Sequence, residues 1–297
     1  MACPGGVRLS GERGREQYMT GGTGQVVVIT GGTRGIGRGM AEAFLARGCR
    51  VVFTGRSAGS VDAALSAAPY RGREDAVLGL ACDSGDAAAL QSLWNRAVER
   101  FGRVDIWINN AALMSPRLDF AQQSPETIEA VIRANVIGAM LATRIALAGM
   151  QSQPGGGQIF NFEGFGSDGT VSPGFAIYGT SKAAMSYFAK TLARETQGGP
   201  VRTGLIFPGI VVTDMITGER EHVSEEQWRK SLKMYEILGD RVETVAPWLA
   251  EQVLANRQHG ARIAWLTRGK AIGRFLSALL LRRKRPSPFA AVASEGR

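Results

Sequence analysis

The chain of 297 residues has a hydrophobic content of 44%, enough to bury one large core, so a single domain is expected. Cys3, Cys49 and Cys82 lie far apart and only two histidines are present, which argues against a disulfide framework or a Cys/His metal site and favours a reducing, cytoplasmic compartment. The net charge of +9 is unevenly placed, because residues 257–297 hold ten basic residues and a single acid. Any electrostatic attraction is therefore expected at the C-terminal tail.

The first 24 residues are rich in Gly and Arg and lack the apolar run of a signal peptide, which predicts a flexible lead-in. No run of about 18 consecutive apolar residues occurs, so no ordinary membrane-spanning helix is expected.

From residue 25 onward, short β-branched runs alternate with longer segments rich in Ala and Leu. Strands are expected at 25–30, 50–54, 76–83, 104–111, 157–162 and 201–207. Helices are expected at 35–47, 59–67, 86–102, 124–151 and 175–196. This alternation predicts a single α/β domain over residues 25–266, with a doubly wound, Rossmann-like parallel sheet and helices on both faces. Ligands of such a sheet bind beyond the carboxyl ends of its strands, where each motif below falls.

The first strand runs into "TGGTRGIG", residues 30–37, which places Gly31, Gly35 and Gly37 between a strand and a helix. Glycine allows a tight turn and a close approach of the backbone to a pyrophosphate, and the helix N-terminus supplies free N–H groups. The turn therefore predicts a dinucleotide site; the alternative is a glycine-rich turn without a ligand.

The end of the second strand, "FTGRS", distinguishes NAD from NADP. An acid there would bind the ribose 2′-hydroxyl of NAD, but Gly55 stands at that position and Arg56 follows. Arg34, inside the glycine turn, can reach the same 2′-phosphate. NADP or NADPH is thus the expected cofactor and NAD is less expected; the alternative is that Arg56 is a solvated loop charge.

Polar residues also close the third and fourth strands. Asp83 can accept a hydrogen bond from the adenine amino group or cap the following helix. Asn109 and Asn110 are expected to tie neighbouring strands together and to line the adenosine ribose.

Tyr178 and Lys182 share one face of a predicted helix, because they are four residues apart. The charge of Lys182 is expected to lower the pKa of Tyr178, which can then pass a proton to a carbonyl oxygen while NADPH delivers hydride. The alternatives are a core tyrosine with a partner for its hydroxyl and, for Asn135, a hydrogen bond to the preceding helical turn.

Together, "TGGTRGIG", "NNAA", Asn135 in "RANVIG", "YGTSK" and "PGIVVTD" resemble the short-chain dehydrogenase/reductase superfamily over about residues 25–266. The resemblance implies that Lys182 binds the nicotinamide ribose, that Asn135 holds a proton-relaying water and that Thr213 positions the carboxamide. It also implies a homo-oligomer, a dimer or a tetramer. The expected cofactor-binding residues are Gly31, Thr33, Arg34, Gly35, Ile36, Gly37, Arg56, Ser57, Asp83, Asn110, Tyr178, Lys182, Ile210 and Thr213.

The serine that this superfamily normally carries about 13 residues before the tyrosine is missing. That spacing points to Phe165 or, by the strand end, to Gly164, and neither has a hydroxyl. Losing one donor to a developing oxyanion typically costs about 100- to 1000-fold in rate. Three substitutes remain open: the Ser167 hydroxyl, a nest of N–H groups from Gly164, Phe165 and Gly166, or a polarising group on the substrate itself.

The stretch "IFNFEGFGSDG…YGTSK", together with "ARIAWLTRGKAIGRFL", is similar to the chlorophyll b reductases, a branch with a glycine-rich segment at the serine position. This resemblance implies NADPH-dependent reduction of the 7-formyl group of chlorophyll b or a related pigment. A reductase of other lipophilic ketones or alcohols remains open, as does a nucleotide sensor or scaffold without catalysis.

Residues 213–245 are expected to form a lid over a hydrophobic small-molecule substrate. Its apolar residues, which could equally make ordinary helix-to-core contacts, are Met215, Ile216, Trp228, Leu232, Met234, Tyr235 and Ile237.

In the tail, 267–297, an apolar stripe at helical spacing precedes Arg282, Arg283, Lys284 and Arg285. It predicts either peripheral membrane contact or packing on the body or a partner subunit. A nucleic-acid partner is not expected, because no groove-reading pattern accompanies the charges.

Overall fold

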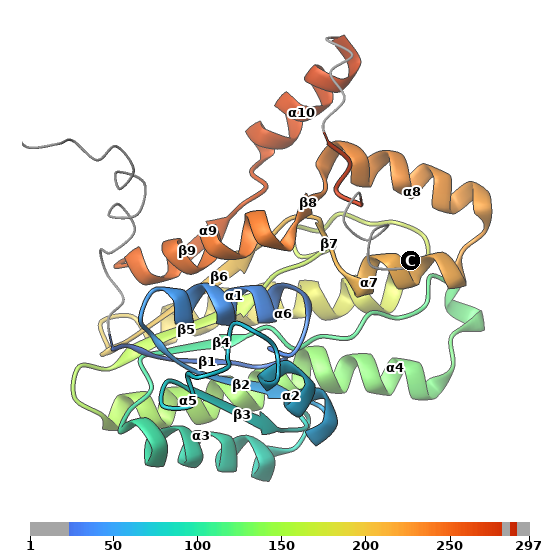
Figure 1. Cartoon of the computed structure of the whole chain (residues 1–297). Coiled ribbons are helices and arrows are strands. Elements are labelled where there is room, and N and C mark those ends of the chain that lie inside the picture. Colours follow the sequence, from blue (N-terminus) through green and yellow to red (C-terminus); the bar gives the residue numbers. More distant parts are fainter. Residues whose placement is uncertain (1–23, 281–285, 290–297) are drawn as a thin grey trace, which may run out of the picture.

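The computed structural model describes residues 24–280 and 286–289 of the chain (Figure 1). The predicted lead-in thus lies, except for Gly24, outside the described residues, and so does the basic run 282–285.

Seven parallel strands form one sheet in the order β3-β2-β1-β4-β5-β6-β9. The strands are β1 (Val26–Ile29), β2 (Arg50–Gly55), β3 (Val77–Ala81), β4 (Ile106–Asn109), β5 (Gly157–Phe162), β6 (Val201–Phe207) and β9 (Ala261–Ala264). The order reverses at β1, where the chain crosses from β3 back to β4, as in a doubly wound sheet. The predicted single-domain, Rossmann-like α/β fold is confirmed, and β9 is a strand that was not expected.

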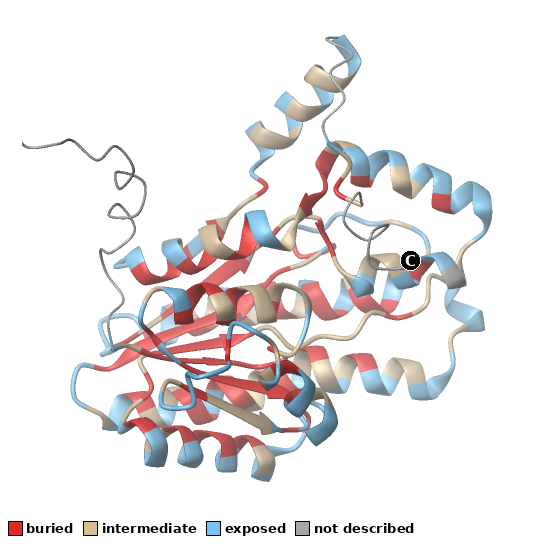
Figure 2. Ribbon diagram, viewed as in Figure 1, coloured by how far each residue is buried: buried red, intermediate tan, exposed pale blue. Residues whose placement is uncertain are grey.

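Helices cover both faces of the sheet, whose inner strands are almost wholly buried, whereas the edge strand β3 is mostly of intermediate exposure (Figure 2). One face packs against α1 (Gly35–Ala46), α2 (Ala58–Leu65) and α9 (Val242–Ala255), and the other against α3 (Ala87–Phe101) and α5 (Ala139–Ser152). The remaining long helix of this core, α6 (Ala176–Glu195), lies beside β5 and β6 and carries "YGTSK". Apolar strands such as Val26–Ile29 can be buried on both sides only in this layered arrangement.

The segment predicted as one helix at 124–151 is interrupted. It consists of α4 (Pro125–Ile132), a π-helical turn at Arg133–Gly138 and α5. By length and composition, Pro125–Ser152 is long and apolar enough to cross a membrane. Val131, Ala142 and Ala146 are nevertheless buried against the protein, which identifies the segment as a core helix of the fold.

The segment between β6 and α9 forms a separate layer beyond the carboxyl ends of the strands. It begins with β7 (Val211–Val212), continues through α7 (Asp214–Thr217), a 3₁₀ turn (Gly218–His222) and α8 (Glu225–Leu238), and closes with β8 (Asp240–Arg241), which pairs with β7. After β9, α10 (Arg268–Leu280) projects away from the body (Figure 1).

Candidate active site

The glycine turn between β1 and α1 leaves no room for side chains. Gly31 has a φ of +69°, and a Cβ there would lie 2.9 Å from the Cα of Ala111. A Cβ on Gly37 would overlap the Gly31 carbonyl oxygen, to which the Asn110 side chain donates a hydrogen bond of 2.9 Å. Gly35, with a φ of +55°, lies against Thr213. The backbone of this turn is therefore open to a diphosphate, and two other predicted cofactor residues, Asn110 and Thr213, border it.

At the end of β2, Gly55 is buried and a Cβ there would lie 2.6 Å from both Thr33 Cγ2 and Ser60 Oγ. Arg56 follows as an exposed residue, and Ser57 accepts a hydrogen bond from the Ser60 backbone N–H as the N-cap of α2. Arg34 is also exposed, with its Nη1 atom 4.0 Å from Asp214 Oδ2. Two solvent-facing guanidinium groups thus lie on the loops that border this strand end, which has no carboxylate of its own.

The other predicted adenosine-side residues have identifiable contacts. Asp83 accepts a hydrogen bond from the Gly85 backbone N–H at 2.9 Å, and Asp86, not Asp83, caps α3. The expectation that Asp83 caps the helix is therefore wrong. Two isoleucines are also among the expected cofactor-binding residues. Ile36 packs against the core, and the Ile210 carbonyl accepts a hydrogen bond from the Asp240 backbone N–H at 2.9 Å.

Asn109 and Asn110 tie three strands together. The Asn109 side chain donates to Asn161 Oδ1 on β5 at 2.9 Å, and the Asn110 side chain donates to the Thr30 carbonyl after β1 at 3.0 Å. The structural part of the prediction for this pair is confirmed.

Tyr178 and Lys182 lie together on the buried face of α6. The Lys182 Nζ atom is 5.7 Å from the centre of the Tyr178 ring and donates a 3.4 Å hydrogen bond to the Phe162 carbonyl. Among the described residues, the Tyr178 hydroxyl has no hydrogen-bond partner, so the alternative of a satisfied core tyrosine does not hold. The hydroxyl is thus free to meet a substrate.

Burial, followed by the Glu219 carboxylate, raises the pKa of Tyr178. The expectation that Lys182 lowers this pKa is therefore wrong in this structure, because desolvation of the phenolate is the largest effect and the Glu219 carboxylate adds to it. Burial also lowers the pKa of Lys182 to about 8, and the nearby Glu163 carboxylate acts in the opposite direction. Tyr178 consequently keeps its proton, which is the form that can protonate a carbonyl oxygen.

Asn135 lies within the π-helical turn and fixes the loop after β4. Its Oδ1 atom accepts from the Leu113 backbone N–H at 2.7 Å, and its Nδ2 donates to the Leu113 carbonyl at 2.8 Å and to Ser181 Oγ at 3.0 Å. The preceding helical turn is therefore not its partner. Both amide protons are used, so a water at this residue can only donate a hydrogen bond to it.

The position of the missing serine is occupied by Gly164. A Cβ on Gly164 would lie 2.7 Å from the Tyr178 hydroxyl oxygen and 3.2 Å from Lys182 Cε. The Ser167 hydroxyl accepts from the Gly164 backbone N–H at 3.0 Å and donates to the Lys182 carbonyl at 3.3 Å. Ser167 thus gives its proton to the backbone of α6, which speaks against its predicted catalytic role, and Gly164 cannot contribute its N–H to an anion-binding nest.

A buried carboxylate at this strand end forms an ion pair with a half-exposed arginine. The Glu163 side chain is only 4% exposed and accepts from Arg262 Nε on β9 at 2.6 Å. Sequence reasoning missed this pair, because 99 positions separate its members. The available signal was an acid directly after a strand expected to be buried, where an unpaired carboxylate would be costly.

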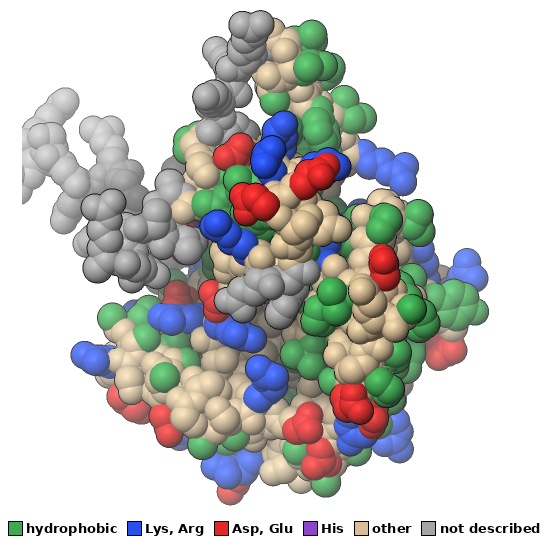
Figure 3. All heavy atoms as spheres, turned by 90° about the vertical axis from the view of Figure 1, so that its right-hand side faces the viewer, with side chains coloured by type: hydrophobic (Ala, Val, Ile, Leu, Met, Phe, Trp, Pro, Cys, Tyr) green, Lys and Arg blue, Asp and Glu red, His purple; other side chains and the backbone are tan. Residues whose placement is uncertain are grey.

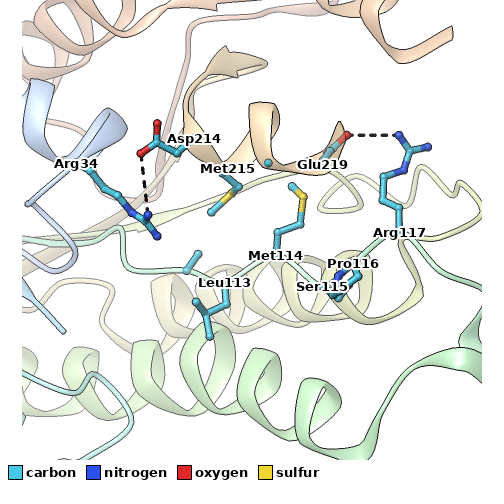
Figure 4. Close-up of a pocket in the computed structure, with 11 residues that line it drawn as sticks. Arg34, Leu113, Met114, Ser115, Pro116, Arg117, Asp214, Met215 and Glu219 are labelled. Carbon is cyan, nitrogen blue, oxygen red and sulfur yellow. Dashed lines mark hydrogen bonds and ion pairs between the residues drawn. The ribbon is translucent and has the colours of Figure 1, made fainter. Parts of the chain in front are cut away.

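A cleft of about 230 Å³ lies between the loop after β4 and the lid segment (Figure 4). Leu113, Met114, Pro116 and Met215 give it apolar walls, Arg34 and Asp214 lie at one end, and Arg117 and Glu219 lie at the other.

The Arg117 end of the cleft is tied to the lid. Arg117 Nη1 donates to Ser231 Oγ at 2.7 Å and lies 3.5 Å from the buried carboxylate of Glu219, which also accepts from the Tyr235 hydroxyl at 2.7 Å. Its guanidinium stacks on the Phe175 ring, just before α6. No local sequence pattern indicates this network, because it joins three separate segments of the chain.

Residues 25–224 match the family model for the short chain dehydrogenases. The chain belongs to that family. This dehydrogenase is 34% identical over 259 residues to the probable chlorophyll(ide) b reductase NYC1, chloroplastic, of Arabidopsis thaliana, covering 81% of the chain but 50% of the relative. It is 33% identical over 261 residues to the chlorophyll(ide) b reductase NOL, chloroplastic, of Oryza sativa subsp. japonica, covering 85% of the chain and 74% of the relative. The chain thus spans about half the length of the first of these relatives.

Among solved structures, the dehydrogenase is similar to a 3-ketoacyl-(acyl-carrier-protein) reductase from Brucella melitensis complexed with NADH. The TM-score is 0.71 at 25% identity, and the match covers 84% of this chain and 99% of the other. The chain therefore has the fold of the short-chain dehydrogenases, a fold that binds a nicotinamide cofactor in this solved relative.

Proposed function

We propose that the protein is an NADPH-dependent reductase of a carbonyl or formyl group on a large hydrophobic substrate, with a chlorophyll b-type 7-formyl group as the leading candidate. The observation that carries the proposal is the unpaired Tyr178 hydroxyl, held beside Lys182 and beneath Gly164. The similarity to chlorophyll(ide) b reductases over more than four fifths of the chain supports this substrate class.

The glycine turn between β1 and α1 fits the diphosphate of a dinucleotide, because its backbone carries no side chains. A Cβ on Gly31 or Gly37 would clash with neighbouring atoms of the turn. NADPH, when bound, supplies the hydride. Tyr178 gives its proton to the substrate oxygen, and the positive charge of Lys182 stabilises the phenolate left behind. Thr213 borders the glycine turn and is the proposed carboxamide contact, and Asn135 holds the loop that forms one wall of the cleft.

Exposed positive charges at the end of β2 favour NADPH over NADH. A 2′-phosphate needs cationic partners, and Arg34 and Arg56 are exposed on the loops around Gly55. Asp83 and Ser57 remain proposed contacts of the adenosine half. No carboxylate occupies the end of β2 to accept from the ribose hydroxyls of NAD.

Glu163 is a positioning residue in this proposal. Its buried carboxylate follows Phe162, whose carbonyl accepts from Lys182, and it favours the charged form of that lysine against the effect of burial. Arg262 in turn orients the Glu163 carboxylate through a 2.6 Å contact from its Nε atom.

Without a serine, Tyr178 is the principal donor to the substrate oxygen. Polarisation of the carbonyl group by the rest of the substrate then substitutes for the missing hydroxyl. An electron-poor formyl group conjugated to a large ring system can provide such polarisation. The absence of a side chain at Gly164 lets the Tyr178 hydroxyl lie close to this backbone, because a Cβ there would be 2.7 Å from the hydroxyl oxygen. Homo-oligomerisation remains a prediction.

The test is NADPH oxidation by the purified protein with chlorophyll b or chlorophyllide b, alongside hydrophobic aldehydes and ketones. The Tyr178→Phe variant should lose about 100- to 10,000-fold in kcat while retaining NADPH binding by fluorescence titration. Equal rates for the two proteins with every substrate would contradict catalysis by Tyr178. Turnover of simple ketones but not of pigments would restrict the proposal to other lipophilic carbonyl compounds.

A further inference from the structure

Helix α10 carries an apolar stripe that no part of the described structure covers. Its side chains are between 40% and 78% exposed; they are Ile272, Phe275, Leu276, Leu279 and Leu280. These positions follow the i, i+3, i+4, i+7, i+8 spacing of a single helix face. Figure 3 shows hydrophobic side chains on this projecting part of the molecule. Soluble surfaces rarely expose a contiguous apolar strip of this kind without a binding role.

The opposite side of α10 holds the helix to the body, which turns the stripe outward. Arg274 donates to the Leu238 carbonyl at 2.8 Å and forms an ion pair of 2.8 Å with Asp240, and its side chain is only 11% exposed. Lys270 lies over the Trp265 ring at 3.1 Å, and Trp265 itself donates to Asp240 at 2.6 Å. The orientation of the stripe is therefore fixed by three side chains, even though the helix stands away from the core.

The residues that flank the stripe along the sequence carry charge of one sign. No acidic residue occurs in the sequence from 252 to 294, whereas ten basic residues lie between 257 and 297. Four of these, Arg282–Arg285, directly follow the stripe in the sequence. An apolar face with basic neighbours is complementary to an anionic bilayer surface. Two copies of the same stripe packed together would instead bring like charges into contact.

We propose that α10 docks the protein on an anionic lipid bilayer, with its apolar stripe in the interface and the basic residues against the headgroups. The helix is about 20 Å long at 1.5 Å per residue, which suits a position in the plane of the interface and is too short to span the hydrocarbon core.

The docked helix also touches the lid. Arg274 binds the last carbonyl of α8, and beyond the stripe the chain returns so that the Phe289 ring lies 6.5 Å from Trp228 and 6.4 Å from Tyr235 on α8 (Figure 1). Tyr235 in turn binds Glu219 in the cleft. On the proposed function, this connection lets a lipophilic substrate pass from the bilayer to the cleft beside the lid, so docking would matter only for substrate dissolved in lipid.

The test is sedimentation of the full chain with vesicles of phosphatidylcholine alone and of phosphatidylcholine with phosphatidylglycerol. Binding should be strong only to the anionic vesicles and should weaken with added salt. The double variant Leu276→Asp/Leu279→Asp should lower the partition coefficient about 100-fold, since each leucine contributes about tenfold or more. The control Gln91→Asp/Asn95→Asp makes the same charge change at exposed sites on α3 and should bind like the original protein.

Failure of the original protein to bind anionic vesicles, or equal binding by the double variant, would overturn the proposal. A lower molecular mass of the double variant by light scattering, with vesicle binding unchanged, would assign the stripe to a second copy instead. The measurement needs no turnover, so its outcome is independent of the proposed reductase function. Turnover of detergent-dispersed substrate should be unaffected in the double variant, and turnover of substrate embedded in vesicles should fall.

Discussion

Gly55 is the last residue of β2, at a position where an acid that binds the NAD ribose is common. Gly164 follows β5, at a position where a serine is expected. The surroundings of the two glycines differ. Around Gly55, the exposed Arg34 and Arg56 offer a charge opposite to that of the missing acid. Around Gly164, the hydroxyl of Ser167, which could have replaced the missing serine, gives its proton to the backbone. The first replacement therefore alters which cofactor is favoured, whereas the second alters how the reaction is catalysed.

The largest effect should come from removing the two arginines beside Gly55. Arg34→Ala/Arg56→Ala should raise the Kd for NADPH about 100-fold, because each charge-assisted phosphate contact contributes about 1.5–3 kcal/mol. Fluorescence titration with NADPH and with NADH checks this, and the NADH value should change little. An equal loss for both cofactors would show that the arginines do not read the 2′-phosphate.

Restoring a serine at the second glycine should lower activity. Gly164→Ser should reduce kcat about tenfold, because its Cβ would lie 2.7 Å from the Tyr178 oxygen and displace the acid. Gly164→Ala should behave alike, since the added carbon is the cause. The control Gly59→Ser adds the same side chain on α2, where a Cβ meets nothing within 4 Å. A serine variant faster than the original protein would show that the enzyme simply lacks a hydroxyl.

A smaller effect, visible in the pH profile, is expected from the ion pair beside Gly164. Lys182 has its pKa lowered to about 8, so kcat/KM for reduction should fall as the pH rises through about 8 and the ammonium loses its proton. Glu163→Gln removes the carboxylate that favours the charged lysine, and the fall should move to lower pH. Glu129→Gln, at an exposed site on α4, should leave the profile in place. An unshifted profile in Glu163→Gln would limit Glu163 to a structural role.

The smallest effect on rate is expected at Ser167. Ser167→Ala removes hydrogen bonds to Gly164 and Lys182, and should lower the melting temperature by about 2–4 °C while changing kcat less than about threefold. Thermal unfolding and NADPH oxidation measure the two quantities. A loss of 100-fold in kcat would instead identify Ser167 as the missing donor.

The sequence predicts the elements of the sheet well because most strands contain a short run of apolar residues between turn signals. The strands β5 and β6 are found at their predicted bounds. It misses β9, a four-residue edge strand with an arginine in it, paired only with β6. It also misses the π-helical turn at Arg133–Gly138, since a change in backbone hydrogen bonding leaves the side-chain pattern unaltered.

Within the candidate site, residues carried by local motifs are predictable and long-range electrostatics are not. The glycine turn and the Tyr178–Lys182 pair follow from spacing alone. The raised pKa of Tyr178 depends on burial and on Glu219, which lies on the lid 41 positions away. Likewise, Arg117 and Glu219 are 102 positions apart and meet only because the lid folds over the loop after β4.

The Phe289 ring packs against Trp228 and Tyr235, which joins the last described residues to α8. A protein shortened at residue 267 would lose this aromatic contact and the Arg274–Asp240 ion pair together. Its lid would be held by fewer contacts at the same time as its apolar stripe disappeared. A change in the activity of a shortened chain could therefore come from the lost membrane contact or from the weaker hold on the segment over the cleft. Point substitutions on the outer face of α10 change only the membrane contact and so distinguish the two causes.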